Sequence, residues 1–184
     1  VEICRIEKSM ENQLPLVYLS ILLVLLSGTA WLIFRQILKT RKVESSFSRL
    51  QNKLKNEKGT PEEYYELGSI YLDKKLFVQS VNLFQKALKE IEGEANENIA
   101  LIYNGLGFSY FAQEQYDIAI RNYKEALKLW PEYVTALNNL GHAYERKKLT
   151  AQALQAYEEA LKYEPNNQTA KRRAESLRKR FVTT

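Results

Sequence analysis

The sequence predicts an all-α protein with two parts, a single apolar helix near the N-terminus and a stack of repeated helix pairs after it. The run from Leu16 to Phe34 is uncharged, and residues 106–131 match residues 140–165 in kind at their key positions. The segments that flank the repeats space their apolar residues along one face of a helix. The expected divisions are an N-terminal flank at 1–13, a transmembrane helix at 14–34, a basic juxtamembrane helix at 35–59, three repeats at 60–167 (61–94, 100–133 and 134–167) and a capping helix at 168–184.

The apolar run from Leu16 to Phe34 is long enough to cross a bilayer. A helix over this range spans about 28 Å, close to the hydrocarbon layer of about 30 Å. Its twelve Leu, Ile, Val and Phe side chains favour insertion by roughly 4 to 7 kcal/mol. We expect Pro15 in the first turn of this helix. A cleaved signal peptide fits less well, because the apolar run continues beyond the small residues at 27–30 and no basic segment leads it.

Charge is distributed unevenly along the chain. Residues 35–59 hold eight basic and two acidic side chains, a net +6, whereas residues 60–167 hold eleven and sixteen, a net −5. Residues 168–184 hold six and one, a net +5. Because Arg35, Lys39, Arg41 and Lys42 directly follow the apolar run, the positive-inside rule predicts that the rest of the chain lies on the cytoplasmic-type side.

The juxtamembrane segment is predicted to be helical. Val43, Phe47, Leu50 and Leu54 are spaced by four, three and four residues, which gives one apolar stripe. Two interpretations stay open: the helix lies against anionic lipid or a partner's helix, or it packs on the domain that follows. We expect Gly59 to end it.

The next helix has a recognisable start. Thr60 is expected to be the N-cap, Pro61 the first helical residue, and Glu63 the residue that completes a capping box.

The repeat consists of small, aromatic and proline residues at fixed places. One copy contains Leu106-Gly107, Tyr110, Ala119, Tyr123, Ala126 and Pro131, and the next contains Leu140-Gly141, Tyr144, Ala153, Tyr157, Ala160 and Pro165 at the same spacing. An earlier copy contains Leu67-Gly68, Tyr71, Ser80, Phe84 and Ala87, and its connection to the second copy is longer around positions 92–97. We expect the small residues where the two helices of a unit cross closely, the aromatic residues between units, and the prolines where second helices end.

This pattern resembles the tetratricopeptide repeat (TPR), a helix–turn–helix unit of about 34 residues. The resemblance implies a solenoid of three repeats, the usual minimum, since each unit buries its face only against a neighbour. It also implies that the first helices of the units line a concave, protein-binding surface. The residues expected there are Tyr65, Glu66, Ser69, Leu72, Asn104, Phe108, Phe111, Asn138, Asn139, His142, Glu145 and Arg146.

The chemistry of this expected groove favours peptide binding. Asparagine amides can donate to and accept from a peptide backbone, and Phe108 and Phe111 can accept an apolar anchor. The alternative is that either phenylalanine packs on the juxtamembrane or capping helix. Chaperone-adaptor members of the family bind a carboxylate through Lys, Arg and Asn at set places. Those places here hold Tyr65, Ser69, Thr135 and Asn139, so that function is not expected.

After Pro165, a spacing of four, three and four residues at Ala170, Ala174, Leu177 and Phe181 predicts a seventh helix that caps the stack. Its exposed side is expected to carry Lys171, Arg172, Arg173, Arg178, Lys179 and Arg180. This side is either a solvated face or a contact for an acidic partner or membrane. Arg172 and Arg173 therefore join Arg35, Lys39, Arg41 and Lys42 as candidate basic contacts. Nucleic acid is not an expected partner, because the repeats are net acidic.

Catalytic function is not expected. The sequence holds one cysteine, Cys4, and one histidine, His142, and it contains no phosphate-binding loop or dinucleotide fingerprint. We therefore expect no catalytic residues, no cofactor and no metal site.

The order of the parts suggests a narrower resemblance. One anchor, the segment RQILKTRKVESSFSRLQNKL at 35–54 and three repeats resemble the membrane-anchored TPR proteins of cyanobacteria and plastids that act in photosystem I assembly or stability. The resemblance implies a single-pass thylakoid protein with its repeats on the stromal or cytoplasmic side, binding photosystem I subunits and membrane lipid. Two alternatives remain: a docking or import receptor of an organelle outer membrane, and a non-catalytic subunit of a membrane enzyme complex.

Overall fold

The computed structural model describes residues 2–91 and 97–182, which form eight α-helices and no strand. The all-α prediction is therefore confirmed. The chain divides into two compact units, residues 1–49 and 50–184. The helices are α1 (Glu2–Asn56), α2 (Pro61–Asp73), α3 (Phe77–Glu90), α4 (Glu97–Ala112), α5 (Tyr116–Leu129), α6 (Val134–Arg146), α7 (Thr150–Tyr163) and α8 (Gln168–Val182).

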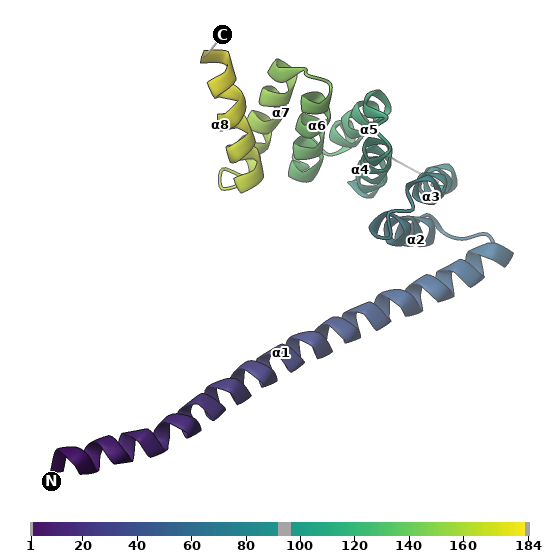
Figure 1. Ribbon diagram of the computed structural model, residues 1–184. Coiled ribbons are helices and arrows are strands. Elements are labelled where there is room, and N and C mark those ends of the chain that lie inside the picture. Colours follow the sequence, from purple (N-terminus) through teal and green to yellow (C-terminus); the bar gives the residue numbers. More distant parts are fainter. Residues whose placement is uncertain (1, 92–96, 183–184) are drawn as a thin grey trace. The chain divides into compact units, whose positions relative to one another are not determined.

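Helix α1 contains the apolar run and continues without a break through the juxtamembrane segment (Figure 1). It is the one helix among the described residues that is long and apolar enough to cross a membrane, with a mean hydropathy of 2.2 over its most apolar window. Pro15 lies inside α1, so the prediction that a helix begins there is wrong. Proline removes one backbone hydrogen bond, a local loss within 55 residues of continuous helix.

The end of α1, from Leu50 onward, packs on the helix pairs. Leu50 is completely buried, and Leu54 packs against the cluster that contains Tyr64 and Phe84. The Lys53 ammonium lies 2.6 Å from the Glu63 carboxylate. For these turns the packing interpretation of the juxtamembrane helix is correct, and the helix ends at Asn56, before Gly59.

Helix α2 begins with the predicted capping box. The Glu63 backbone N–H donates to the Thr60 hydroxyl over 3.3 Å, and the Thr60 N–H donates to the Glu63 carboxylate over 3.2 Å. Pro61 occupies the first turn, where its missing N–H costs little.

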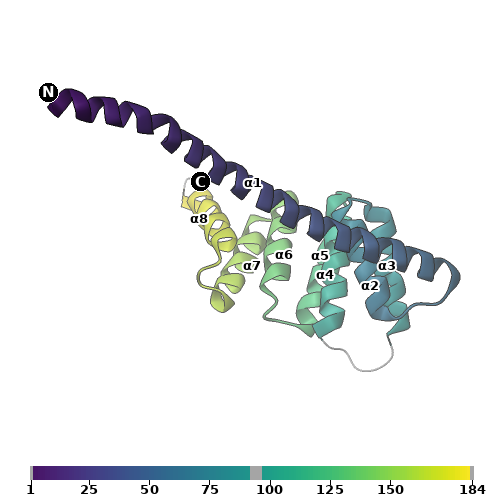
Figure 2. The same ribbon diagram turned by 90° about the horizontal axis from the view of Figure 1, so that it is seen from below.

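Helices α2 to α8 lie side by side in chain order (Figures 1 and 2). Each packs against the next, and in addition α2 contacts α4 and α4 contacts α6. No comparable contact joins α3 to α5 or α5 to α7 in the part of the chain that the structure describes. The first helices of the pairs therefore form the inner, more crowded side of the stack. The extra residues of the first repeat, 92–96, lie outside the described residues.

Three glycines of the inner helices each face an aromatic ring of their own pair. A Cβ on Gly107 would lie 2.5 Å from the ring of Tyr123, and one on Gly141 would lie 2.8 Å from Tyr157. Gly68 faces Phe84 in the same way, with a Cβ distance of 2.9 Å. The glycines thus make room for buried aromatic rings. These rings contact a glycine of their own helix pair, in addition to the position between units that the sequence predicts.

The turns between paired helices contain a feature that glycine content does not reveal. Lys75, Glu114 and Lys148, at equivalent places in the repeats, all have φ of 60°. Non-glycine residues seldom occupy this left-handed region. Backbone bonds hold each turn, for instance from the Leu76 N–H to the Tyr71 carbonyl over 2.8 Å.

Candidate protein-binding groove

The groove is defined here as the inner faces of α2, α4 and α6 together with the start of α8. The twelve residues that the sequence predicts for it all lie on α2, α4 and α6. They differ in how far the domain already uses them. Those residues are Tyr65, Glu66, Ser69, Leu72, Asn104, Phe108, Phe111, Asn138, Asn139, His142, Glu145 and Arg146.

The α2 end of the groove is largely committed to packing. The Tyr65 ring lies 5.8 Å from the Phe84 ring, and Leu72 is half-buried against the same cluster. The Ser69 hydroxyl donates to the Tyr65 carbonyl over 2.9 Å. This end therefore offers a partner the half-buried Tyr65 ring and the exposed acidic side chains of α2.

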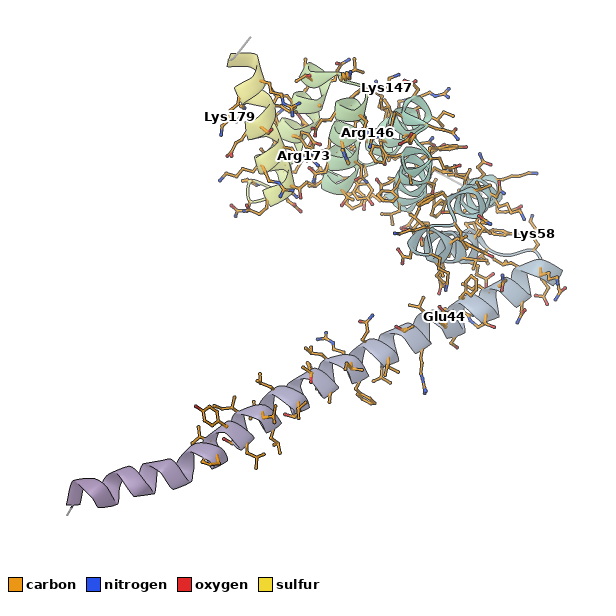
Figure 3. The ribbon with its side chains drawn as sticks, in the orientation of Figure 1. Glu44, Lys58, Arg146, Lys147, Arg173 and Lys179 are labelled. Carbon is orange, nitrogen blue, oxygen red and sulfur yellow. The ribbon has the colours of Figure 1, made fainter. Side chains whose placement is uncertain are left out.

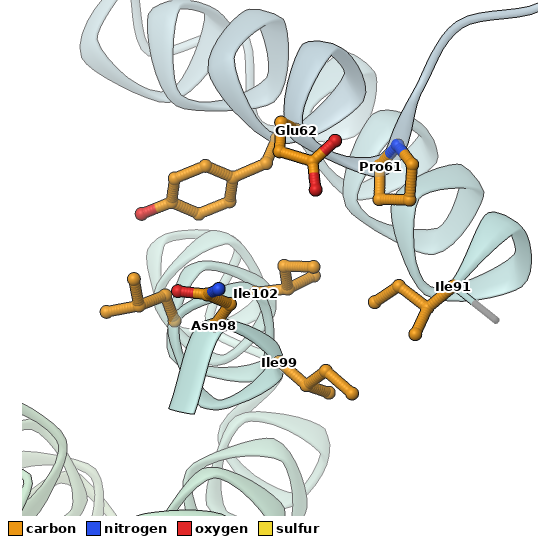
Figure 4. A pocket seen from close by; sticks show the side chains of 8 residues that line it. Pro61, Glu62, Ile91, Asn98, Ile99 and Ile102 are labelled. Carbon is orange, nitrogen blue, oxygen red and sulfur yellow. The ribbon is translucent and has the colours of Figure 1, made fainter. Parts of the chain in front are cut away.

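A pocket of about 270 Å³ opens beside Tyr65 (Figure 4). The sequence did not predict it, although the apolar residues in the first turns of α4 are a signal that could have indicated it. Hydrogen bonds from its own backbone N–H and from the Thr60 hydroxyl lower the pKa of Glu62, so a carboxylate stands at the rim. The lining consists of Pro61, Glu62, Tyr65, Ile91, Asn98, Ile99, Leu101 and Ile102.

A chain of polar side chains links α4 to α6. The Asn139 amide donates to the Asn104 side-chain oxygen over 3.0 Å, and the Asn104 amide donates to the Tyr133 hydroxyl over 3.2 Å. Tyr133 is a residue that the sequence did not predict for the site; its ring stacks on Trp130 with centroids 4.5 Å apart. Burial raises the pKa of Tyr133, so its hydroxyl stays protonated. Both asparagines are half-buried and keep unused hydrogen-bonding positions.

Asn138 has a structural role. Its amide donates to the Asn167 side-chain oxygen over 3.3 Å, and that oxygen also accepts from the Ala170 backbone N–H at the start of α8. The Asn138 side-chain oxygen is itself buried, with no hydrogen-bond partner among the described residues. Asn138 thus fixes the start of α8, and Asn139 is the better candidate for contact with a peptide.

The two phenylalanines of α4 differ. Phe108 is 42% exposed, whereas the Phe111 ring lies 4.8 Å from the His142 ring and 5.4 Å from the Tyr116 ring. Phe111 therefore joins α4 to α6, and Phe108 is the apolar side chain that the groove offers to a partner.

Charged groups surround His142. Burial lowers the pKa of His142; Arg173 and Arg146 lower it further, whereas Glu145 opposes them. The Arg146 guanidinium lies 5.0 Å from the Tyr116 ring centre and 3.4 Å from the Glu114 carboxylate. His142 is therefore mostly neutral near pH 7, between two cations.

Arg173 does not lie on the outer face of α8, where the sequence analysis placed it. It is half-buried and approaches the Glu145 carboxylate at 3.4 Å, on the side of α8 that faces α6 (Figure 3). Glu145 also accepts a 2.6 Å hydrogen bond from Tyr157. Arg173 is thus a groove residue, because it packs where a further inner helix would continue the stack. Arg172, next to it, is exposed.

The other predicted basic contacts lie on α1. Arg35 is exposed and lies 5.7 Å from the Trp31 ring centre, and Arg41 and Lys42 are exposed as well. The side chain of Lys39 lies outside the described residues.

The groove is equipped for binding. Within the described residues, no group of His, Cys, Asp and Glu could hold a metal ion. The groove offers amide groups, aromatic faces and charged groups, which recognise peptides by non-covalent contacts.

Known proteins resemble this chain in its repeats and also in most of the sequence outside them. A tetratricopeptide-repeat family model matches residues 63–132 and 98–163. The protein ycf37 of Pyropia yezoensis is 38% identical over 170 residues, covering 90% of this chain and 96% of that protein. The chloroplastic TPR domain-containing protein PYG7 of Arabidopsis thaliana is 36% identical over 170 residues. That match covers 92% of this chain but only 56% of PYG7, so the chain spans little more than half of that relative.

Solved structures show the same fold. The TPR domain of Arabidopsis OM64 superposes with a TM-score of 0.60 at 26% identity, covering 65% of this chain and 95% of that domain. The protein MamA superposes with a TM-score of 0.67 at 20% identity, covering 76% of this chain and 78% of MamA.

Proposed function

This chain belongs to the tetratricopeptide-repeat family, in the group that includes ycf37 and PYG7 of plastids, and we propose that it is a membrane-anchored scaffold that holds photosystem I subunits together during assembly. A TPR scaffold that binds proteins follows from the family. The membrane, the thylakoid location and the photosystem are the parts that we propose.

The extent of the relationship to ycf37 is the observation that carries the proposal. The match covers 90% of the chain, far more than the repeats, and so must extend well into α1. TPR domains alone occur in many settings, whereas the combination of this N-terminal helix with three repeats is the order that resembles photosystem I assembly factors. Since only 56% of PYG7 is matched, activities of that whole protein do not transfer automatically.

The chemistry of α1 supports a membrane location. Its apolar side chains are exposed on all sides, as with Leu19 at 61% and Leu25 at 61%. The hydroxyls of Ser20, Ser27 and Thr29 donate to carbonyls one turn earlier, so they need no water. Such a surface is stable in lipid and unfavourable in water. The basic residues after the span favour the stromal or cytoplasmic side for the repeats.

The groove supports a protein partner. Phe108 is exposed on an inner helix, beside helices that carry half-buried amides. Exposed aromatic side chains flanked by hydrogen-bonding groups are typical anchor points in protein interfaces.

Affinity purification from detergent-solubilised thylakoids tests the function. We expect the tagged full-length chain to resist extraction from membranes by alkaline carbonate and to co-purify with photosystem I subunits. Phe108→Ala should reduce that co-purification about five- to thirty-fold, as expected for loss of an anchor contribution of about 1–2 kcal/mol. The matched control is Val78→Ala, which removes an apolar side chain 60% exposed on the outer helix α3.

Three results would contradict the proposal. Release by carbonate would remove the anchor, and recovery of presequence-bearing precursors instead of photosystem subunits would indicate an import receptor. Equal losses in Phe108→Ala and Val78→Ala would show that the groove is not the binding face.

A further inference from the structure

The repeat register extends into α8. It places some basic residues of α8 on the face toward the groove and others on the face away from it. Alignment of residues 170–177 with residues 136–143, one repeat earlier, places Ala170, Ala174 and Leu177 where α6 has Ala136, Leu140 and Ala143. All six of these side chains are buried, with exposures of 7% or less. Helix α8 therefore packs on α7 as an inner helix packs on the pair before it, in the place of the first helix of a fourth repeat.

In this register Arg172 and Arg173 hold the places of Asn138 and Asn139. The inner position of Arg173 has independent support, because it approaches Glu145 of α6 and acts on His142. Lys171 holds the place of Leu137, which lines a pocket between α6 and its partner helix α7. Lys171 therefore lies on the side of α8 away from the inner face, where it is exposed.

The groove consequently has opposite charges at its two ends. Its α2 end carries the exposed acidic groups Glu62, Glu66 and Asp73. Its other end carries Arg146, Arg172 and Arg173; within the described part of the chain, only Arg173 of these is paired with an inner carboxylate, Glu145. Arg146 pairs with Glu114, which is 75% exposed, so a better placed carboxylate can compete for it.

We propose that the end of the groove formed by Arg146, Arg172 and Arg173 binds an acidic peptide segment of the partner protein, next to an apolar side chain held at Phe108. Arginine presents several donors in a planar fork that matches a carboxylate in two-point contacts. The Asn104 and Asn139 amides lie on the helices between these groups, where they meet the peptide backbone. The acidic residues of α2 repel the acidic segment from the opposite end and so fix the direction of the chain.

The proposed basic end of the groove differs from the carboxylate clamp of chaperone adaptors. The equivalent clamp places hold Tyr65, Ser69, Thr135 and Asn139, which carry no positive charge. The cations here come from the last helix of the stack, and they suit an internal acidic segment as well as a free C-terminus.

The test uses the full-length chain in phosphatidylcholine nanodiscs. A fluorescein-labelled short peptide of Glu and Asp around one Phe is titrated and followed by anisotropy, beside a peptide with Gln and Asn in place of the acids. We expect the acidic peptide to bind at least tenfold more tightly, with the preference decreasing at high salt. Arg172→Gln should weaken its binding about three- to tenfold. The neighbouring Lys171→Gln, an equal change in charge on the same helix, should have less than about a twofold effect.

Equal binding of the two peptides, or equal effects of Arg172→Gln and Lys171→Gln, would overturn the proposal. So would displacement of the acidic peptide by phosphatidylglycerol vesicles but not by phosphatidylcholine vesicles, since that result assigns the basic end to lipid. The inference rests on the proposed function only in requiring a protein partner for the groove. Co-purification of photosystem subunits with unchanged yield in Arg172→Gln would remove the acidic-segment site and leave the scaffold. Peptide binding as expected without any co-purified photosystem subunit would do the reverse.

Discussion

The first and second junctions between repeats fill equivalent places with different chemistry. At the first junction Ser80 and Ser109 are completely buried, and their hydroxyls lie 3.2 Å apart. At the second junction the same places hold Ala119 and Ala143, also completely buried. The Ser80 hydroxyl donates to the Gly68 carbonyl over 2.9 Å. The Ser109 hydroxyl shares its single hydrogen between the Ser80 hydroxyl and the Gly105 carbonyl, which lies at 2.9 Å. These two places in the repeat therefore require small side chains. The side chains can be polar where both places hold serine, because the two hydroxyls then lie within hydrogen-bonding distance of each other.

A second difference concerns the inner face. At the first junction Gly105 lies against Phe84, where a Cβ would approach the ring to 2.7 Å. The equivalent residue at the second junction is Asn139, whose side chain reaches across to Asn104. The first junction is therefore closed by an aromatic ring on glycine, and the second by a hydrogen bond between side chains. The second junction is also the one next to the basic end of the groove.

The largest effect is expected from Gly107→Leu, which alters the helix pair that both junctions share. Its Cβ would lie 2.5 Å from Tyr123, a ring only 1% exposed, so the two helices must separate. We expect a loss of about 3 kcal/mol or more and a fall of roughly 10 °C in the Tm followed by circular dichroism. Gly28→Leu is the matched control, because no atom lies within 4 Å of a Cβ there. An unchanged Tm in Gly107→Leu would contradict the repeat register.

Exchanging the inner-face residues of the two junctions should lower stability by different amounts. Gly105→Asn introduces the second junction's residue against Phe84 and should cost about 2 kcal/mol through overpacking. Asn139→Gly removes one hydrogen bond and should cost about 1 kcal/mol. Urea unfolding of both variants measures the difference, and Phe84→Leu should partly restore Gly105→Asn. Equal losses would mean that the two junctions tolerate the same side chains.

A smaller effect is expected at the buried serines. Ser80→Ala or Ser109→Ala alone should cost about 1 kcal/mol, because each removes a hydrogen bond and leaves the other hydroxyl with one partner fewer. The double variant recreates the alanine pair of the second junction, so its cost should be less than the sum of the two. A double-mutant cycle in urea measures this coupling, and strict additivity would argue against it.

The sequence predicted features that local physics determines, and it failed where contacts between distant residues decide. Thr60 and Glu63 cap α2 because a capping box needs only residues three apart, and the glycines mark close packing because no other residue fits. The inner position of Arg173 was missed because a helix that looks amphipathic does not reveal which polar face lies toward the groove. The sequence left two environments open for Leu50, because an apolar stripe on a helix has the same spacing whether it packs against lipid or against protein. The role of Tyr133 and the presence of the pocket beside Tyr65 depend on how neighbouring helix pairs pack together. The periodicity of the sequence does not predict that packing.

The smallest effect, in pH dependence, belongs to the second junction alone, because His142 is the single histidine of the sequence. Burial lowers the pKa of His142 in the folded chain, and Arg173 and Arg146 add to this more than Glu145 opposes it. The unfolded chain then binds a proton more readily, so stability should fall as the pH decreases through the ordinary histidine pKa near 6.5 and level off below the folded pKa. Between about pH 7.5 and about pH 5.5 the urea midpoint of the wild type should therefore decrease more than that of His142→Gln, while carboxylates common to both proteins contribute equally. A steeper decrease in His142→Gln would reverse the sign and would mean that the histidine is stabilised as a cation, with Glu145 rather than the arginines as its dominant neighbour.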